Sequence, residues 1–321
     1  MSPENFALIV KNKLLWEKMA TLNEQKKLMS IALFGALAIS FAPMLYLFSG
    51  KNPLTGAFFR MFYALPLLGI IILISKKHDP RTSKTRLFAF FAGMILAIDF
   101  VSYHSAIDWI GTGIATLIGN SQVIIVTLIS WWLLNEKPNR SILISLPIVM
   151  LGLALISGIW DENPYGESPL KGVIAGVSAA FFYSGFLLMY RYSNRSLAPS
   201  ANLQFDATSG AVFGLLILGF LPLQPLLIEP IDFQPSWPSH AWLILLAAIC
   251  QTLGWIAISY SLPRLPGAHT SFAILLQPVL TIIWGILFLS ESPSLQQSFG
   301  MILILGSIIG VTIFGSIDEK S

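Results

Sequence analysis

Ten long and nearly uninterrupted apolar runs dominate this sequence of 321 residues and restrict what the chain can fold into. A helix that crosses a lipid bilayer needs about 20 mostly apolar residues, because the hydrocarbon layer is ~30 Å thick and a helix rises ~1.5 Å per residue. Each run is close to that length and is bounded by charged residues, proline or glycine. The runs cover approximately residues 28–47, 53–75, 87–107, 112–134, 141–159, 171–190, 206–227, 241–262, 268–289 and 297–315.

The fold class that these runs predict is an all-α polytopic membrane protein with 10 transmembrane helices. Membrane-spanning β-strands would alternate apolar and polar residues, whereas these runs are continuously apolar. Hydrophobic residues make up 55% of the chain and charged residues 11%, which excludes an ordinary water-soluble globule. The single cysteine, Cys250, excludes an internal disulfide and a multi-cysteine metal site. A net charge of only +3 argues against nucleic acid as a partner.

The positive charges predict the orientation of the chain, because Lys and Arg in short loops stay on the cytoplasmic side. With a cytoplasmic N-terminus, 16 of the 19 basic residues fall on that side. Only Lys51 and Lys171 fall outside, and Arg60 lies within a run. We therefore expect an integral protein of the cytoplasmic (inner) membrane with both termini in the cytoplasm.

An internal duplication divides the chain into two halves. A shift of 155 residues places Gln122 on Gln277 and Glu136 on Glu291. Because each unit has five helices, an odd number, the second copy would cross the membrane in the opposite orientation, as in secondary transporters. Chance similarity between apolar runs is the alternative. The expected organisation is a cytoplasmic tail over 1–27, a first repeat over 28–160, an external linker over 161–170, a second repeat over 171–315 and a cytoplasmic tail over 316–321.

The first half carries the motifs Tyr103–Ile107, Gly111–Leu117 and Leu133–Pro138, and the second half carries Gly267–Ala268, Gln277–Pro278 and Leu289–Pro293. With these motifs the chain resembles the EamA-type transporters of the drug/metabolite transporter superfamily. The resemblance implies a bundle of 10 helices with a central cavity, which moves small organic metabolites and often exports amino acids or related compounds. One position departs from the family pattern, since Val123 replaces its usual proline while the second half keeps Pro278.

Two charged residues inside the predicted helices are the strongest site candidates. A charge at the centre of a membrane costs at least about 2.5 to 3.5 kcal/mol, so each one requires a partner or a polar cavity. Arg60 and Asp99 lie at similar depths on consecutive, antiparallel helices. We expect them to face each other or to share one water-filled pocket that binds substrate. A salt bridge that only holds the bundle together is the alternative.

His104 is the natural candidate for proton coupling, with Asp99 as a second, because an imidazole changes its charge near neutral pH. The alternative is a neutral histidine that forms hydrogen bonds in the core of the bundle. A metal site is not expected, since His104 has only Asp108 as a potential ligand one turn further along the helix.

Polar and aromatic residues at helical spacing predict the remaining lining of a cavity. The same residues could instead hold helices together through hydrogen bonds, and the sequence leaves this alternative open. Pro43 and Pro278 are expected to kink their helices. The further candidates for substrate binding are Tyr103, Asn120, Gln122, Gln251, Trp255, Gln277 and Trp284.

The function that the sequence predicts is secondary transport by alternating access, with no cofactor. A membrane-embedded enzyme and a passive pore are the rival classes, but neither a nucleophile with its base nor rings of charge are evident. The expected partners are a small-molecule metabolite and membrane lipids. Gly306 and Gly310, at GxxxG spacing, would also allow a homodimer.

Overall fold

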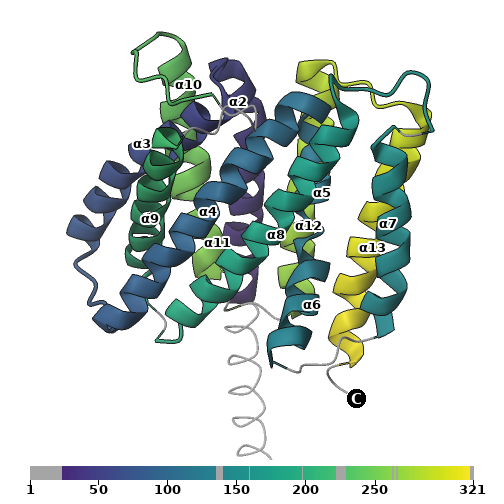
Figure 1. Ribbon diagram of the computed structural model, residues 1–321. Coiled ribbons are helices and arrows are strands. Elements are labelled where there is room, and N and C mark those ends of the chain that lie inside the picture. The colour runs from purple at the N-terminus through teal and green to yellow at the C-terminus, as the bar shows by residue number, and fades with distance from the viewer. Residues whose placement is uncertain are drawn as a thin grey trace, which may run out of the picture.

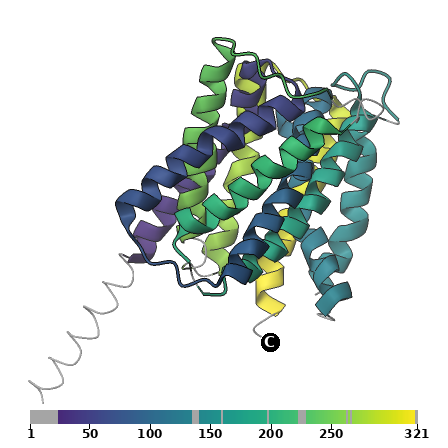
Figure 2. The same cartoon turned by 60° about the vertical axis from the view of Figure 1, so that its left-hand side comes forward.

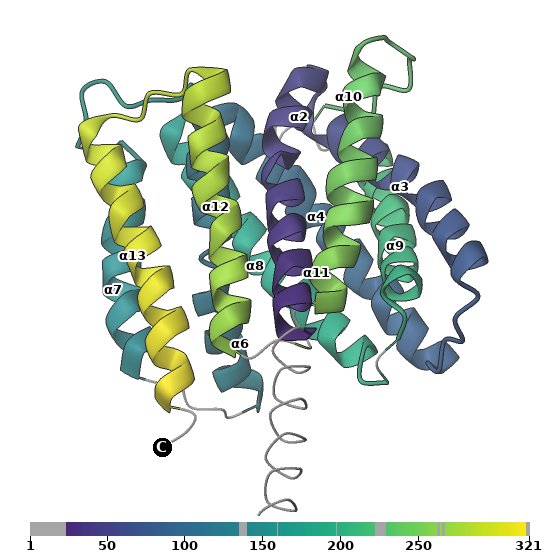
Figure 3. The same cartoon turned by 180° about the vertical axis from the view of Figure 1, so that it is seen from behind.

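The computed structural model describes residues 24–134, 140–158, 160–196, 198–221, 229–261, 264 and 267–318, and every regular element within them is a helix (Figure 1). Glu136 of the predicted duplication and most of the two predicted tails lie outside these residues. The described chain begins and ends at the same end of the bundle (Figures 1 and 3). Figure 2 shows that the helices cross at angles instead of running parallel.

The described part of each of the ten predicted apolar runs lies mainly on one helix or on consecutive helices, and the end of the run over 206–227 lies outside the described residues. The run predicted over 112–134 is divided between two helices, and the run over 241–262 contains a π-helix. In chain order the helices are one over residues 24–40, α2 (Ala42–Ser49), α3 (Pro53–Ser75), α4 (Ser83–Ile110), α5 (Thr112–Gly119), α6 (Gln122–Leu134), α7 (Arg140–Ile156), α8 (Pro169–Ser193), α9 (Ser200–Phe220), α10 (Ser239–Leu245), the π-helix η2 (Leu246–Gly254), α11 (Trp255–Ser261), α12 (Gly267–Leu289) and α13 (Leu295–Asp318).

Six helical segments within the described residues are long and apolar enough to cross a membrane. Four shorter apolar helices accompany them, so that a total of 10 crossings stays a prediction. Large apolar side chains lie on the outside, such as Phe220, which is 83% exposed, and Trp132, which is 81% exposed. Such a surface is unfavourable in water and suits lipid. The six segments are Glu24–Ser49, Pro53–Ser75, Ser83–Ile110, Pro169–Ser193, Ser200–Phe220 and Ser239–Ser261.

Helix α4 packs against α8 and α9 and connects the two halves of the chain. Its closest approach to α9 uses glycine on both sides. A Cβ atom at Gly93 would lie 1.8 Å from the carbonyl oxygen of Ala207, and one at Gly210 would lie 1.8 Å from that of Phe90. The two backbones can therefore touch only where no side chain intervenes, which is a common way of packing membrane helices.

We predict that Gly93→Ala destabilises the protein by about 1–3 kcal/mol or more, because the added methyl group must push two backbones apart. Thermal unfolding of the purified protein in detergent would measure the effect. Gly69→Ala is the control, since its added carbon would meet only Phe205, at an ordinary distance of 3.9 Å. Equal melting temperatures of the two variants would contradict this account of the packing.

A buried glutamate closes one end of the bundle. Glu291, 6% exposed, follows α12 and places its carboxylate on the N-terminus of α5. It accepts hydrogen bonds from the backbone N–H and the hydroxyl of Thr112 and from the backbone N–H of Gly113, the last at 3.1 Å. A carboxylate at a helix N-terminus satisfies free N–H groups and the helix dipole together. Gly111 is required beside it, because its φ is +83° and a Cβ would lie 2.9 Å from the carboxylate.

Glu291→Ala should lower the free energy of unfolding by roughly 0.5–2 kcal/mol, the usual cost of losing a cap. Glu291→Gln should lower it less, because one amide oxygen can still accept from Thr112. Melting temperatures would be compared with that of Glu162→Ala, which removes an exposed carboxylate from the same end of the bundle. The cap would have no importance if Glu291→Ala melted with this control.

Candidate functional site

A cavity of about 230 Å³ lies between the two halves of the chain. Helices from both halves contribute to it, including α3, α4, α5 and α6 from the first and α8, α11 and α12 from the second. Its walls combine apolar and aromatic side chains with a few polar groups, as is typical of small-molecule sites. The polar and aromatic lining residues are Arg60, Asp99, Phe100, Tyr103, Thr116, Asn120, Gln122, Tyr183, Trp255 and Gln277.

The structure brings seven of the nine predicted substrate-binding residues to this cavity. Of the other two, Gln251 lies behind Arg60 and bonds to it, whereas Trp284 lies elsewhere. Phe100 also lines the cavity and was not predicted from the sequence. The seven are Arg60, Asp99, Tyr103, Asn120, Gln122, Trp255 and Gln277.

Among the described residues, Arg60 is the only arginine that lines the cavity, and it is 3% exposed. Its Nε donates to the side-chain oxygen of Gln251 over 3.0 Å. Its guanidinium carbon lies 4.2 Å from the centre of the Phe100 ring, within the range of a cation–π interaction. No hydrogen bond or ion pair to the described residues uses the two terminal nitrogens. These nitrogens therefore retain the planar pair of donors that binds a carboxylate.

Asp99 lines the same cavity and is 6% exposed. The direct contact with Arg60 that the sequence allowed is not present, since the ion pairs within 4.0 Å among the described residues do not include these two. The two residues share one pocket instead, which is the second arrangement that we expected. A basic and an acidic side chain thus border one space without an ion pair between them.

A break between two helices brings further polar groups to the cavity. Helix α5 ends at Gly119 and α6 begins at Gln122. Asn120 in the break donates from its amide to the carbonyl of Thr116 over 2.8 Å. The side-chain oxygen of Gln122 is buried and has no hydrogen-bond partner within the described part of the chain. Broken helices at membrane depth are tolerated where they line a cavity.

The π-helix η2 positions the partner of Arg60. It covers Leu246–Gly254 and so contains Gln251, and α11 begins directly after it with Trp255. The Trp255 ring meets Tyr183 of α8 edge to face, with ring centres 6.2 Å apart. π-helical turns occur often at functional sites. This one places the Gln251 amide against Arg60, and Trp255 directly after it lines the cavity.

Trp284 lies in helix packing instead of lining the cavity. Its Nε1 donates to the hydroxyl of Ser40 over 3.0 Å, and its ring stacks on Phe41 at 5.0 Å. The helix over residues 24–40 is interrupted at Phe41, and Pro43 lies in the first turn of α2. Pro278, the other predicted kink, lies inside the uninterrupted helix α12.

His104 is buried beside the cavity but does not line it. Its ring stacks on Tyr46, with ring centres 3.9 Å apart, and its Nδ1 lies 3.2 Å from the carbonyl oxygen of Pro53. Nε2 has no hydrogen-bond partner among the described residues. This placement fits the alternative of a neutral histidine in the core, and proton coupling through His104 stays a prediction.

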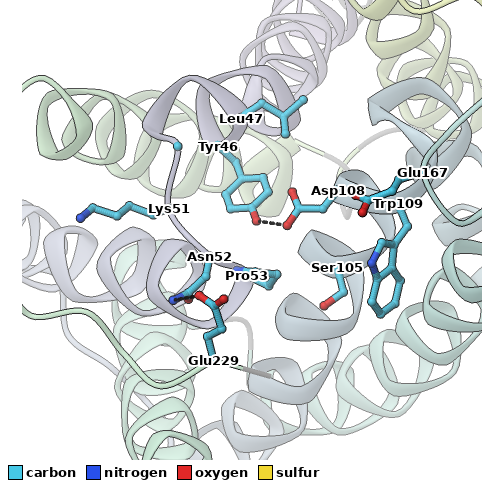
Figure 4. A pocket seen from close by; sticks show the side chains of 11 residues that line it. Tyr46, Leu47, Lys51, Asn52, Pro53, Ser105, Asp108, Trp109, Glu167 and Glu229 are labelled. Atoms are coloured by element: carbon cyan, nitrogen blue, oxygen red, sulfur yellow. Dashed lines mark hydrogen bonds between the residues drawn. The ribbon is translucent and has the colours of Figure 1, made fainter. Parts of the chain in front are cut away.

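A second pocket, of about 450 Å³, opens at the end of the bundle that is capped by Glu291. Figure 4 shows Asp108, Glu167 and Glu229 around it, with the Tyr46 hydroxyl donating to Asp108 over 2.9 Å. Next to it, Lys51 bonds to Asp232 at 2.6 Å. This hydrogen bond holds the pKa of Asp232 below its ordinary value. This pocket was not predicted from the sequence.

Comparisons with known proteins now place the chain among its relatives. The model of the EamA-like transporter family matches residues 28–158 and again residues 170–313. The chain belongs to this family. It is 25% identical to the uncharacterized transporter sll1319 of Synechocystis sp. over 78% of this chain and 76% of that protein. It is 26% identical to protein PecM of Dickeya dadantii over 80% of this chain and 82% of that protein.

A solved structure shares the fold of this EamA-family chain. A crystal structure at 16% identity superposes with a TM-score of 0.59 and covers 92% of this chain and all of the other. An uncharacterized transporter of Archaeoglobus fulgidus is 24% identical over 83% of this chain and 91% of that protein. The family and its relatives identify the chain as an integral membrane transporter for small molecules and point away from an enzyme.

Gln251→Leu should destabilise this EamA-family protein by about 1–3 kcal/mol, because the buried Nε of Arg60 would lose its acceptor. The measurement is the melting temperature in detergent. Gln234→Leu, at an exposed position, is the matched control. An unchanged melting temperature for Gln251→Leu would mean that Arg60 finds another acceptor and that Gln251 does not hold it.

Proposed function

We propose that the chain is a secondary transporter that exports small zwitterionic metabolites, such as amino acids or related compounds, across the cytoplasmic membrane. The observation that carries this proposal is the shared cavity of Arg60 and Asp99, a basic and an acidic side chain that form no ion pair within 4.0 Å with each other or with the other described residues. Arg60 would bind a carboxylate through two parallel hydrogen bonds. Asp99, with the free side-chain oxygen of Gln122, would bind an ammonium group.

Energetics favour a substrate with both charges. A buried charge is expensive unless it is paired, and Arg60 and Asp99 do not approach each other closely enough for an ion pair within 4.0 Å. A zwitterion neutralises Arg60 and Asp99 together, whereas a simple acid or amine leaves one of them unpaired. The aromatic rings of Tyr183 and Trp255 would hold the apolar part of the same molecule. At about 230 Å³ the cavity suits a small metabolite.

Alternating access between two inverted five-helix repeats would expose this cavity to each side in turn. The packing supports a two-fold arrangement, because helices in equivalent positions of the two halves contact each other. Helix α7 packs on α13, α5 on α12 and α3 on α9. The axis relating these pairs would pass through the region of the cavity. Ten crossings then place both termini in the cytoplasm, in agreement with the charge distribution of the loops.

Counterflow in proteoliposomes tests the proposal. Vesicles loaded with an unlabelled amino acid should accumulate the same labelled compound, and the initial rate should saturate with concentration. Arg60→Gln and Asp99→Asn should each reduce the rate about ten- to 100-fold, the equivalent of roughly 1.5–3 kcal/mol for a hydrogen bond to a charged group. Arg195→Gln, at an exposed position outside the cavity, should transport normally.

Three results would overturn parts of this proposal. Flux that rises linearly with concentration and shows no counterflow would indicate a pore. Turnover of a lipid or solute by the reconstituted protein would indicate an enzyme. Normal transport by both Arg60→Gln and Asp99→Asn would place the substrate elsewhere in the protein.

A further inference from the structure

A groove separates α7 from α13 at the end of the pair where α7 begins, at a distance from the transport cavity. The two helices lie side by side at one edge of the bundle (Figures 1 and 3). The groove has a volume of about 570 Å³. Its floor and walls include Arg140, Ser141 and Ser145 of α7 and Gly306, Ser307 and Gly310 of α13.

The glycines explain the shape of this groove. Further along the pair, the helices touch, because a Cβ at Gly152 would lie 2.9 Å from the carbonyl oxygen of Gly300. At Gly306 and Gly310 an added Cβ would meet no described atom within 4 Å. The GxxxG pair therefore does not serve the contact between α7 and α13. These two glycines instead leave the groove open along the surface of the helix pair.

One polar group in the groove points to an occupant. Ser307 is 6% exposed, and its hydroxyl has no hydrogen-bond partner among the described residues. A buried hydroxyl without an acceptor is unfavourable in an apolar environment. Ser145, which bonds to the Ser307 carbonyl at 3.5 Å, lies five residues from Arg140, about 7.5 Å along the helix. A ligand acceptor at that depth would satisfy the hydroxyl.

The mouth of the groove is positively charged. Arg140 is exposed there and is the first residue of α7. A helix N-terminus carries a partial positive charge that adds to the guanidinium. Basic pockets between membrane helices bind the headgroups of anionic lipids.

We propose that the groove binds one anionic phospholipid. Its phosphate lies on Arg140 and the N-terminus of α7, an ester oxygen accepts from the Ser307 hydroxyl, and an acyl chain lies along Gly306 and Gly310. A second copy of the chain fits the groove less well. Contact through GxxxG requires two backbones to approach closely, but Ile144 and Ile302, each 64% exposed, border this groove and stand in the way. An acyl chain is thin enough to lie between them.

Native mass spectrometry of the purified protein tests this inference directly. Phosphatidylglycerol and phosphatidylcholine with identical acyl chains would be titrated, and the protein with one bound lipid would be counted. We expect the wild type to retain phosphatidylglycerol preferentially. Arg140→Gln should bind it roughly fivefold more weakly, as expected for one basic residue near a lipid phosphate. Gly306→Leu should lose both lipids, because its side chain fills the groove.

Matched controls separate the groove from the rest of the surface. Arg191→Gln removes an exposed arginine from α8, and Ala241→Leu enlarges an exposed residue on α10. Both should bind phosphatidylglycerol as the wild type does. Leucine forms helices better than glycine, so Gly306→Leu should fold. Gly310→Leu provides a second variant with the same expected loss.

Each contrary outcome overturns the proposal in a defined way. Equal retention of lipid by the wild type, Arg140→Gln and Gly306→Leu would show that lipid binds elsewhere. A dimer in the wild type that Gly306→Leu converts to a monomer would assign the groove to a second copy of the chain. If inorganic phosphate at the same concentration displaced phosphatidylglycerol, the groove would be a site for an anion and would not bind the acyl chain.

Discussion

The structure depends on the rule that a polar group inside a bilayer must find its partner within the protein or in a cavity, because lipid offers none. Arg60 illustrates the rule. Gln251 accepts from its Nε and the Phe100 ring lies against its guanidinium, while the residue lines a cavity. The residues that hold Arg60 come from α4 and η2, in different halves of the chain. The cation is therefore fixed only when the two halves are packed together.

The same rule accounts for the places where helices are interrupted. Where the first membrane helix breaks near Phe41, the carbonyl of Ser40 accepts a hydrogen bond from Thr281 of α12 over 3.1 Å. Where α5 begins, Glu291 from the other half of the chain satisfies its first N–H groups. Irregular backbone in one half is thus satisfied by side chains of the other. This exchange allows the broken helices to line a central cavity without exposing backbone to lipid.

Sequence patterns predicted the helices well, because a run of about 20 apolar residues has few alternatives in a membrane. They also predicted that Arg60, Asp99 and Gln122 would border a cavity, since such groups cannot face lipid. They could not predict that Arg60 bonds to Gln251 instead of Asp99. A hydrogen-bond partner depends on side-chain direction, and here that direction depends on a π-helix with no local signal. Trp284 was predicted to line the cavity but packs between helices instead. Its depth in the membrane could not distinguish a cavity wall from a helix contact.

The helix break within the run over 112–134 shows that a proline does not by itself decide where a membrane helix is interrupted. By resemblance to the family, Val123 occupies the position of a usual proline in the first half, whereas the second half retains Pro278. A proline-based argument would put the stronger interruption at Pro278, yet α12 continues through Pro278 while the first half breaks at Asn120 and Ser121. The Thr116 carbonyl there accepts from both the backbone N–H and the side-chain amide of Asn120, at 3.0 and 2.8 Å. The break is therefore present without a proline, and Asn120 within it lines the cavity.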